Sequence, residues 1–210
     1  IKVQRIMSWG KDFDEEKLTE MIGRKIRQEK ITIKDVKMRT FITEDVSRQD
    51  MVQHVYDITY GTVRPNEDTL VVIDDSIVRG TTLRESIIRM LGRLKPKKII
   101  VVSSAPQIRY PDCYGIDMSK MGDFIAFQAA IELLKERDQR AMLTELYKEC
   151  KELQRTNQLH TKNVVRGVYA SFEPQEISDK IAQMITTPGV EIPVQVIYQT
   201  IEDLHDSCPT

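Results

Sequence analysis

Two carboxylates stand side by side directly after an apolar run. Asp74 and Asp75 follow residues 70–73 (Leu-Val-Val-Ile), a run that predicts a strand. Because neighbouring strand residues point to opposite faces, both carboxylates serve one site only if the strand ends there. Adjacent carboxylates also repel each other, and either the two hydroxyls of a ribose or an Mg²⁺ ion would offset that repulsion. The pair therefore indicates a sugar-diol or magnesium site, with a solvated acidic turn as the alternative.

The loop after the acidic pair predicts a phosphate site. Residues 82–85 (Thr-Leu-Arg-Glu) have the form of a capping box, which would begin a helix at Leu83 with its positive end facing the loop. Backbone N–H groups, threonine hydroxyls and this helix end would bind an anion, and a glycine would let it approach closely. The glycine spacings of P-loop and dinucleotide sites are absent. A phosphorylated ribose fits both halves, and the loop residues expected to bind it are Ser76, Val78, Arg79, Gly80, Thr81 and Thr82.

The elements around this segment predict an α/β fold. An amphipathic helix at 83–94 and a second apolar strand at 99–102 complete a βαβ unit with parallel strands. Unbroken apolar runs are typical of strands buried on both faces, and ligands bind at the carboxyl ends of such sheets. Patterning predicts further helices near 12–30, 47–60, 122–136, 138–155 and 174–186, a strand at 37–42, and an edge strand at 192–199 that begins beside Pro193.

Composition excludes several classes of protein. The 210 residues are 40% hydrophobic, and their net charge of -1 gives no electrostatic reason to expect nucleic acid or an anionic membrane as a partner. No apolar run approaches the roughly 18 residues that a membrane span needs. The three cysteines, Cys113, Cys150 and Cys208, are far apart and odd in number, which argues against a disulfide framework. These features are typical of a cytoplasmic protein with reduced thiols.

Residues 70–82 resemble the motif with which type I phosphoribosyltransferases bind 5-phosphoribosyl 1-pyrophosphate (PRPP). Within that family, the sequence Asp-Asp-Ser-Ile-Val-Arg-Gly-Thr-Thr at 74–82 resembles the amidophosphoribosyltransferases. Three flanking segments are similar to the same family, so that the good match spans about 37–135: residues 39–42 (Arg-Thr-Phe-Ile), 104–111 (Ser-Ala-Pro-Gln-Ile-Arg-Tyr-Pro) and 114–117 (Tyr-Gly-Ile-Asp).

The resemblance implies an open parallel sheet of the type I phosphoribosyltransferase kind, present in part. It implies a core at 37–136, preceded by a helical lead-in or insertion at 1–36. Because the last strong α/β pattern lies near residue 102, we expect 137–210 to be a mostly helical C-terminal appendage. Asp74 and Asp75 would hold the ribose hydroxyls of PRPP and its Mg²⁺, and the loop that follows would hold the 5-phosphate. The implied reaction is attack of ammonia on C1 with loss of pyrophosphate, which gives phosphoribosylamine in the first step of purine synthesis. No catalytic residue is assigned.

The resemblance also implies partners and departures. Family members take ammonia from an N-terminal glutaminase domain with a cysteine nucleophile, and no cysteine precedes Cys113 here. Because the chain also begins at Ile1, we expect it to be the C-terminal part of a longer enzyme. The family's pyrophosphate loop is not found, and Arg48 is the one base in residues 43–50. Cys208 stands without a paired cysteine, so we expect no iron–sulfur cluster. Purine nucleotides and a homo-oligomer are further implied partners.

Three other interpretations stay open. Another type I phosphoribosyltransferase, or a PRPP-sensing regulator without catalysis, would carry the same motif; a regulator would need a basic DNA-binding helix, and none is evident. A response-regulator receiver domain also has an acidic pair after a strand. It requires a phospho-accepting aspartate at the end of another strand further along the chain. Here the strand at 99–102 runs into residues 103–106 (Ser-Ser-Ala-Pro), and Asp112 and Asp117 lie beyond it.

Overall fold

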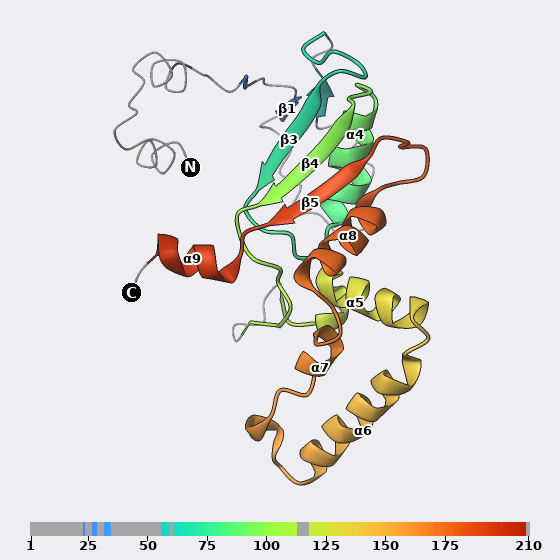
Figure 1. Cartoon of the computed structure of the whole chain (residues 1–210), viewed down its shortest axis with the longest axis vertical. Coiled ribbons are helices and arrows are strands. Elements are labelled where there is room, and N and C mark those ends of the chain that lie inside the picture. Colours follow the sequence, from blue (N-terminus) through green and yellow to red (C-terminus); the bar gives the residue numbers. More distant parts are fainter. Residues whose placement is uncertain are drawn as a thin grey trace, which may run out of the picture.

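A three-stranded parallel sheet forms the centre of the fold (Figure 1). The computed structural model describes residues 61–112 and 118–208, together with Gly23, residues 27–28 and the backbone of 32–34 and 56–58. The strands are hydrogen-bonded in the order β3 (Thr69–Asp74), β4 (Lys98–Ser103) and β5 (Val194–Tyr198). The α/β fold class expected from the sequence is confirmed.

The register of the sheet pairs residues from distant parts of the chain. At the carboxyl end, Asp74 pairs with Ser103, and Ser103 pairs with Tyr198. Two residue pairs further back and on the same face as Ser103, Val101 is fully buried and Val196 is 1% exposed, so this face of the sheet belongs to the core. The acidic pair therefore stands at the edge of a well-packed layer, which limits how far its backbone can move.

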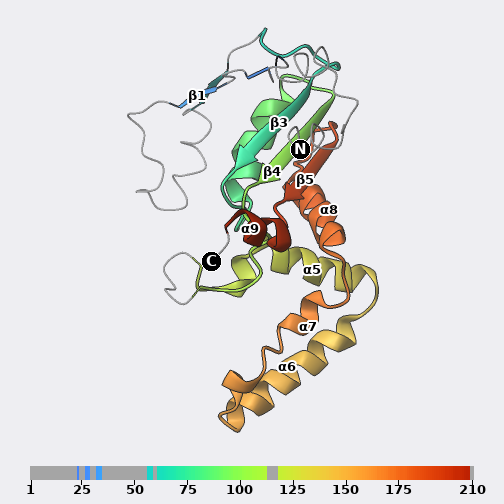
Figure 2. The same cartoon turned by 60° about the vertical axis from the view of Figure 1, so that its left-hand side comes forward.

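Helices cover one face of this sheet (Figures 1 and 2). After β3 the chain is helical from Thr81, passes through a π-helical turn and continues as α4; after a long excursion, α8 returns to pack against β5. Proline at its first position and a capping box between Glu173 and Glu176 begin α8. The helical elements are η1 (Leu83–Ile87), α4 (Ile88–Gly92), η2 (Met121–Asp123), α5 (Ile125–Glu136), α6 (Arg140–Arg155), η3 (Leu159–Thr161), α7 (Arg166–Tyr169), α8 (Pro174–Ile185) and α9 (Ile201–Ser207).

The excursion between α5 and α8 is a helical hairpin that points away from the sheet (Figure 2). Its long helix, α6, lies beside the short helix α7. A Cβ added to Gly167 would lie 2.8 Å from Cδ2 of Leu146, so the absence of a side chain lets α7 approach α6 closely. The expected helices at 122–136, 138–155 and 174–186 correspond to α5, α6 and α8.

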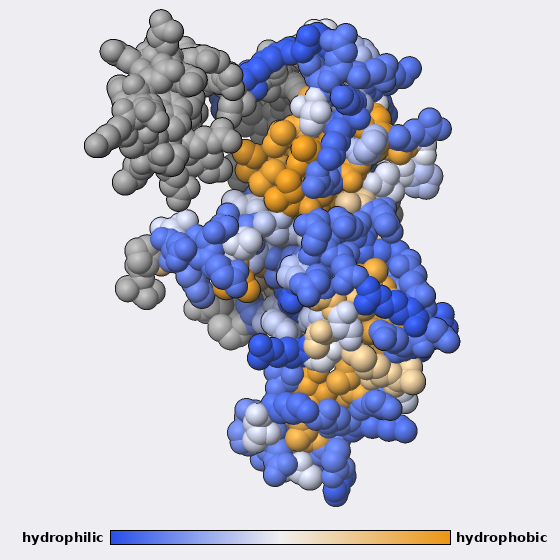
Figure 3. All heavy atoms as spheres, in the orientation of Figure 1, coloured by the Kyte–Doolittle hydropathy of each residue, from blue (hydrophilic) through white to orange (hydrophobic). Residues whose placement is uncertain are grey.

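The other face of the sheet differs from the expectation. The apolar run at 70–73 predicts burial on both faces, but Val71 is 59% exposed, Ile73 is 75% exposed and, on β5, Ile197 is 42% exposed. Figure 3 shows hydrophobic side chains on this face of the sheet. The prediction of two buried faces is wrong because α4 and α8 both lie on the opposite side, where Leu70 and Val72 pack against the core.

Two expectations for the first 60 residues are corrected where the structure describes them. Tyr56–Ile58 form strand β2, paired antiparallel with β1 (Thr32–Lys34), so the expected helix at 47–60 is wrong over these residues. Of the expected helix at 12–30, Gly23 is helical and residues 27–28 are not. The expected strand at 37–42, Arg48 and the segment 114–117 lie outside the described residues. No helix in the described part of the chain is long and apolar enough to span a membrane.

Candidate functional site

The acidic pair lies where β3 ends. Asp74 is the last residue of the strand and Asp75 follows it, so the condition for both carboxylates to serve one site is met. The Asp75 N–H donates to Oδ1 of Asp74 at 3.0 Å, and the Ser76 N–H donates to Oδ1 of Asp75 at 2.7 Å. Burial raises the pKa of the half-buried Asp74, the Asp75 N–H lowers it, and the charge of Asp75 raises it further. A cation or hydroxyl donors would offset this penalty.

Ser104, the residue after β4, holds the backbone of the pair. Its N–H donates to the Asp74 carbonyl at 2.9 Å. Its hydroxyl lies 3.1 Å from the Asp75 carbonyl oxygen and 3.3 Å from that of Asp74. The sequence placed Ser104 in a segment similar to the family but gave it no role, because only the pairing of β3 with β4 brings it beside the acids.

The loop that follows rests on the start of α5. Gly80 has φ of +68°, and a Cβ there would lie 2.5 Å from Cδ1 of Ile125 and 3.2 Å from Cγ2 of Ile185. The Ile125 N–H donates to the Val78 carbonyl at 2.8 Å. Glycine therefore serves two needs at once: it takes a left-handed conformation and it lets the loop approach two buried side chains.

The helix after the loop begins earlier than the sequence predicts. Thr82 has helical dihedrals and makes no side-chain cap, and Glu85 accepts instead from Nε of Arg84 at 2.8 Å. The capping box expected at 82–85 is therefore wrong. The first helical bond joins the Arg84 N–H to the Gly80 carbonyl at 2.9 Å, so the Thr81 and Thr82 N–H groups precede the helical ladder. Both threonines are exposed.

The remaining loop residues complete a continuous surface. Arg79 is about half exposed, and its Nη2 lies 3.9 Å from Oδ2 of Asp123, which precedes α5. Ser76 and Val78 are partly buried between the acidic pair and Gly80. All eight residues expected from the sequence thus lie on one segment at the carboxyl end of β3, with carboxylates at one end and N–H groups and hydroxyls at the other.

The segment after Ser104 is tied to α7 and α8. Arg109 donates to Oε1 of Gln107, and its guanidinium lies 5.0 Å from the centre of the Tyr169 ring. The Tyr169 hydroxyl donates to the Arg109 carbonyl at 2.9 Å, and Nε2 of Gln107 lies 2.9 Å from Oγ of Ser178. These contacts give Arg109 a packing role between the segment and α7.

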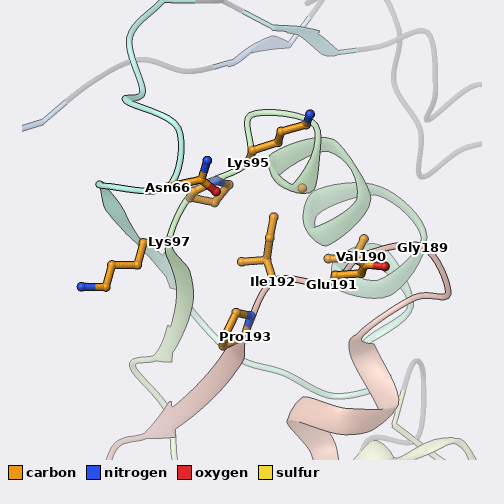
Figure 4. Close-up of a pocket in the computed structure, with 10 residues that line it drawn as sticks. Asn66, Lys95, Lys97, Gly189, Val190, Glu191, Ile192 and Pro193 are labelled. Atoms are coloured by element: carbon orange, nitrogen blue, oxygen red, sulfur yellow. The ribbon is translucent and has the colours of Figure 1, made fainter.

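Two cavities among the described residues lie away from the acidic pair and its loop. The larger, of about 600 Å³, lies at the amino ends of β4 and β5, at the opposite end of the sheet from the acids (Figure 4). Lys95, Lys97 and Ile192 are among its lining residues. The second, of about 350 Å³, lies between α6 and η3 and includes Cys150 and His160. The acidic pair and the loop after it line neither of these two cavities.

The chain is similar to several known amidophosphoribosyltransferases. The chain is 43% identical to the amidophosphoribosyltransferase of Haemophilus influenzae over 70 residues, which are 33% of this chain and 14% of that protein. It is 48% identical to that of Pasteurella multocida over 61 residues, or 29% and 12% of the two chains. A longer match, 30% identical over 151 residues, covers 70% of this chain and 18% of the amidophosphoribosyltransferase of Schizosaccharomyces pombe. No protein-family model matches the chain.

These matches agree with the motif at the site. Each relative is much longer than the matched part, so the chain matches less than a fifth of their length. In the structure, the acidic pair of this segment lies at the end of β3, and Gly80 of the same segment has a positive φ. The resemblance is confirmed, and the chain is a relative of the amidophosphoribosyltransferases over a small part of their length.

Proposed function

We propose that this chain is the PRPP-binding part of an amidophosphoribosyltransferase. The observation that carries the proposal is the meeting, on one segment, of two carboxylates at the end of β3 and an exposed loop that leads into a helix N-terminus. Asp74 and Asp75 would accept hydrogen bonds from the ribose hydroxyls. The 5-phosphate would lie against the loop, where the N–H groups and hydroxyls of Thr81 and Thr82 precede the helical ladder.

The residues present fit an Mg²⁺ ion that arrives with its ligand. Both carboxylates offer hard oxygen atoms. Burial and the charge of Asp75 raise the pKa of Asp74, so a bound cation would stabilise its charged form. Among the described residues, no three His, Cys, Asp or Glu side chains form a metal cluster. One or two carboxylates are enough for Mg²⁺, which keeps several waters and binds substrate phosphates. When bound, the ion would neutralise charge on the pyrophosphate as it leaves.

In the proposed reaction, the nitrogen of ammonia attacks C1 of PRPP. The bond from C1 to the pyrophosphate oxygen breaks, the electron pair leaves with pyrophosphate, and the ammonium product releases a proton to solvent. The chain contributes by positioning: the carboxylates orient the ribose and the loop fixes the phosphate, so that C1 is presented in one orientation. We propose that the ammonia comes from glutamine through another domain of a longer protein. We propose that this protein also binds purine nucleotides, forms a homo-oligomer and is cytoplasmic.

The residues at the end of β4 argue against a response-regulator receiver domain. Ser103 is its last residue, is fully buried and donates its hydroxyl to the Ala105 carbonyl at 2.8 Å. A phospho-accepting aspartate is therefore missing from that strand end, and Ser104, next in the chain, supports the acidic pair instead.

Calorimetry with a short ligand series tests the proposal. We expect PRPP with Mg²⁺ to bind more tightly than ribose 5-phosphate, and ribose 5-phosphate more tightly than orthophosphate, because each adds a group that the site recognises. Removing Mg²⁺ should weaken the binding of PRPP more than the binding of the other two ligands. If orthophosphate binds as tightly as PRPP with Mg²⁺, or if acetyl phosphate phosphorylates the chain, the proposal is wrong.

A further inference from the structure

The Ser104 hydroxyl makes a contact that the sheet does not require. β3 and β4 end at Asp74 and Ser103, and the Ser104 N–H extends their ladder by one bond. Asp75 lies beyond the strand, and its carbonyl is reached by the Ser104 hydroxyl at 3.1 Å. The same hydroxyl lies 3.3 Å from the Asp74 carbonyl, so one donor spans both residues of the acidic pair.

This contact restrains the backbone that carries both carboxylates. A side chain leaves its Cα at an angle fixed by the backbone, so holding the two carbonyls holds the two Cα–Cβ bonds. The carboxylate of Asp75 also accepts the Ser76 N–H at 2.7 Å, which couples its orientation to the same stretch of backbone. Ser104 is exposed, so loss of its hydroxyl leaves no cavity in the core.

The phosphate half of the site is held by other residues. Val78 accepts the Ile125 N–H, and Gly80 packs against the Ile125 side chain. Neither contact includes Ser104. The two halves of the candidate site therefore have separate supports, one from the end of β4 and one from the start of α5.

We propose that Ser104 is a positioning residue for the sugar-diol half of the site. It acts through Asp74 and Asp75, holding their carboxylates where two neighbouring ribose hydroxyls can donate to them, and it leaves phosphate binding unaffected. The inference rests on the proposed function, because it assumes that the carboxylates recognise a ribose.

Ribose 5-phosphate and 2-deoxyribose 5-phosphate separate the two halves, since they differ by one hydroxyl and share the phosphate. In calorimetry with Mg²⁺, we expect the natural chain to prefer ribose 5-phosphate. Ser104→Ala should reduce that preference about three- to tenfold, the effect of one ordinary hydrogen bond, and leave orthophosphate affinity unchanged. Ser104→Thr keeps the hydroxyl and should restore the preference.

The control is Thr161→Val in η3, which removes an exposed hydroxyl that donates to the Gln158 carbonyl at 2.7 Å, far from the acids. It should change neither affinity. An unchanged preference in Ser104→Ala, or an equal loss of both sugars and orthophosphate, would overturn the inference. If Ser104→Ala does not fold, Ser104→Cys provides the weaker donor. A natural chain that binds neither sugar phosphate would instead refute the proposed function, so the two failures are distinct.

Discussion

Gly80 of the loop lies directly against Ile125 at the start of α5. A Cβ on Gly80 would come 2.5 Å from Cδ1 of Ile125, closer than real side chains approach. The Ile125 N–H meanwhile donates to the Val78 carbonyl two residues earlier. The loop that is expected to bind phosphate therefore takes its shape from a helix that begins more than 40 residues later in the sequence.

Gly80→Ala should destabilise the fold and weaken phosphate binding. The positive φ of Gly80 costs about 1–2 kcal/mol with a side chain, and the contact with Ile125 adds about 1–3 kcal/mol. Gly189→Ala is the matched control, because Gly189 has φ of +87° and open space around it. Ile125→Val removes Cδ1 and should recover part of the loss in Gly80→Ala. Urea unfolding measures all three; equal losses in the two alanine variants would contradict the role of Ile125.

The stability of the chain should respond in opposite ways to loss of the hydroxyl of Tyr169 and of Tyr198. Tyr169 donates to the Arg109 carbonyl, so Tyr169→Phe should lower the free energy of unfolding by about 1 kcal/mol. The Tyr198 hydroxyl is buried and has no hydrogen-bond partner among the described residues, so Tyr198→Phe should raise it by about 1 kcal/mol. Chemical unfolding at neutral pH compares the two. Destabilisation of similar size in both variants would show that Tyr198 has a partner in solution.

The same tyrosines predict a loss of stability in alkali. Burial raises the pKa of both above the ordinary value of 10.0. As the pH rises above that value, the unfolded chain releases protons that the folded chain keeps, so the unfolded state is favoured. The free energy of unfolding should fall above about pH 10, and Tyr198→Phe should make its decrease with pH less steep. An unchanged slope in the variant would contradict burial of Tyr198.

The exposed face of the sheet predicts a contrast between two valines. Val71 is 59% exposed, whereas Val101 on the neighbouring strand is fully buried. Threonine has the shape of valine but carries a hydroxyl. Val101→Thr should therefore lower the free energy of unfolding by about 1–3 kcal/mol, and Val71→Thr should lower it by less than about 0.5 kcal/mol. Thermal and urea unfolding provide the comparison, and a cost at Val71 equal to that at Val101 would mean that this face is covered in solution.

The acidic pair predicts a pH dependence of metal and ligand binding. Because burial raises the pKa of Asp74 above its ordinary 3.8, a proton competes with Mg²⁺ at this carboxylate at a higher pH than at a free aspartate. Affinity for Mg²⁺ with PRPP should weaken as the pH falls through the raised pKa of Asp74, with proton release on binding. The stability of the ligand-free chain should change in the opposite direction. The folded chain binds the Asp74 proton more tightly than the unfolded chain, so the contribution of Asp74 to stability is lost as the pH rises through its raised pKa. Calorimetry in buffers of different ionisation enthalpy detects the released proton, and Asp74→Asn should abolish it.

Local sequence was enough to predict the main parts of the candidate site. The apolar run at 70–73, the two acids and Gly80 are neighbours in the chain, and strand formation, charge repulsion and glycine geometry act over such short distances. The second strand and the helices α5, α6 and α8 were predicted for the same reason, from periodicity within each segment.

Contacts between distant segments could not be predicted in this way. Ser104 reaches the Asp75 carbonyl across 29 residues, and only the register of β3 and β4 brings them together. The capping box at 82–85 was wrong because Gly80 already turns the chain into the helix. Exposure of Val71 and Ile73 depends on which face the helices cover, and an apolar run does not encode that choice.

The most direct test of the central claim is calorimetry of the chain and of Asp74→Asn/Asp75→Asn with PRPP and Mg²⁺. The double substitution keeps size and removes charge, and circular dichroism shows whether the fold is kept. We predict that the natural chain binds, that the double variant loses the binding, and that both keep the same weak affinity for orthophosphate. Equal binding of PRPP with Mg²⁺ by the natural chain and the double variant would contradict the assignment of this strand end as the PRPP site.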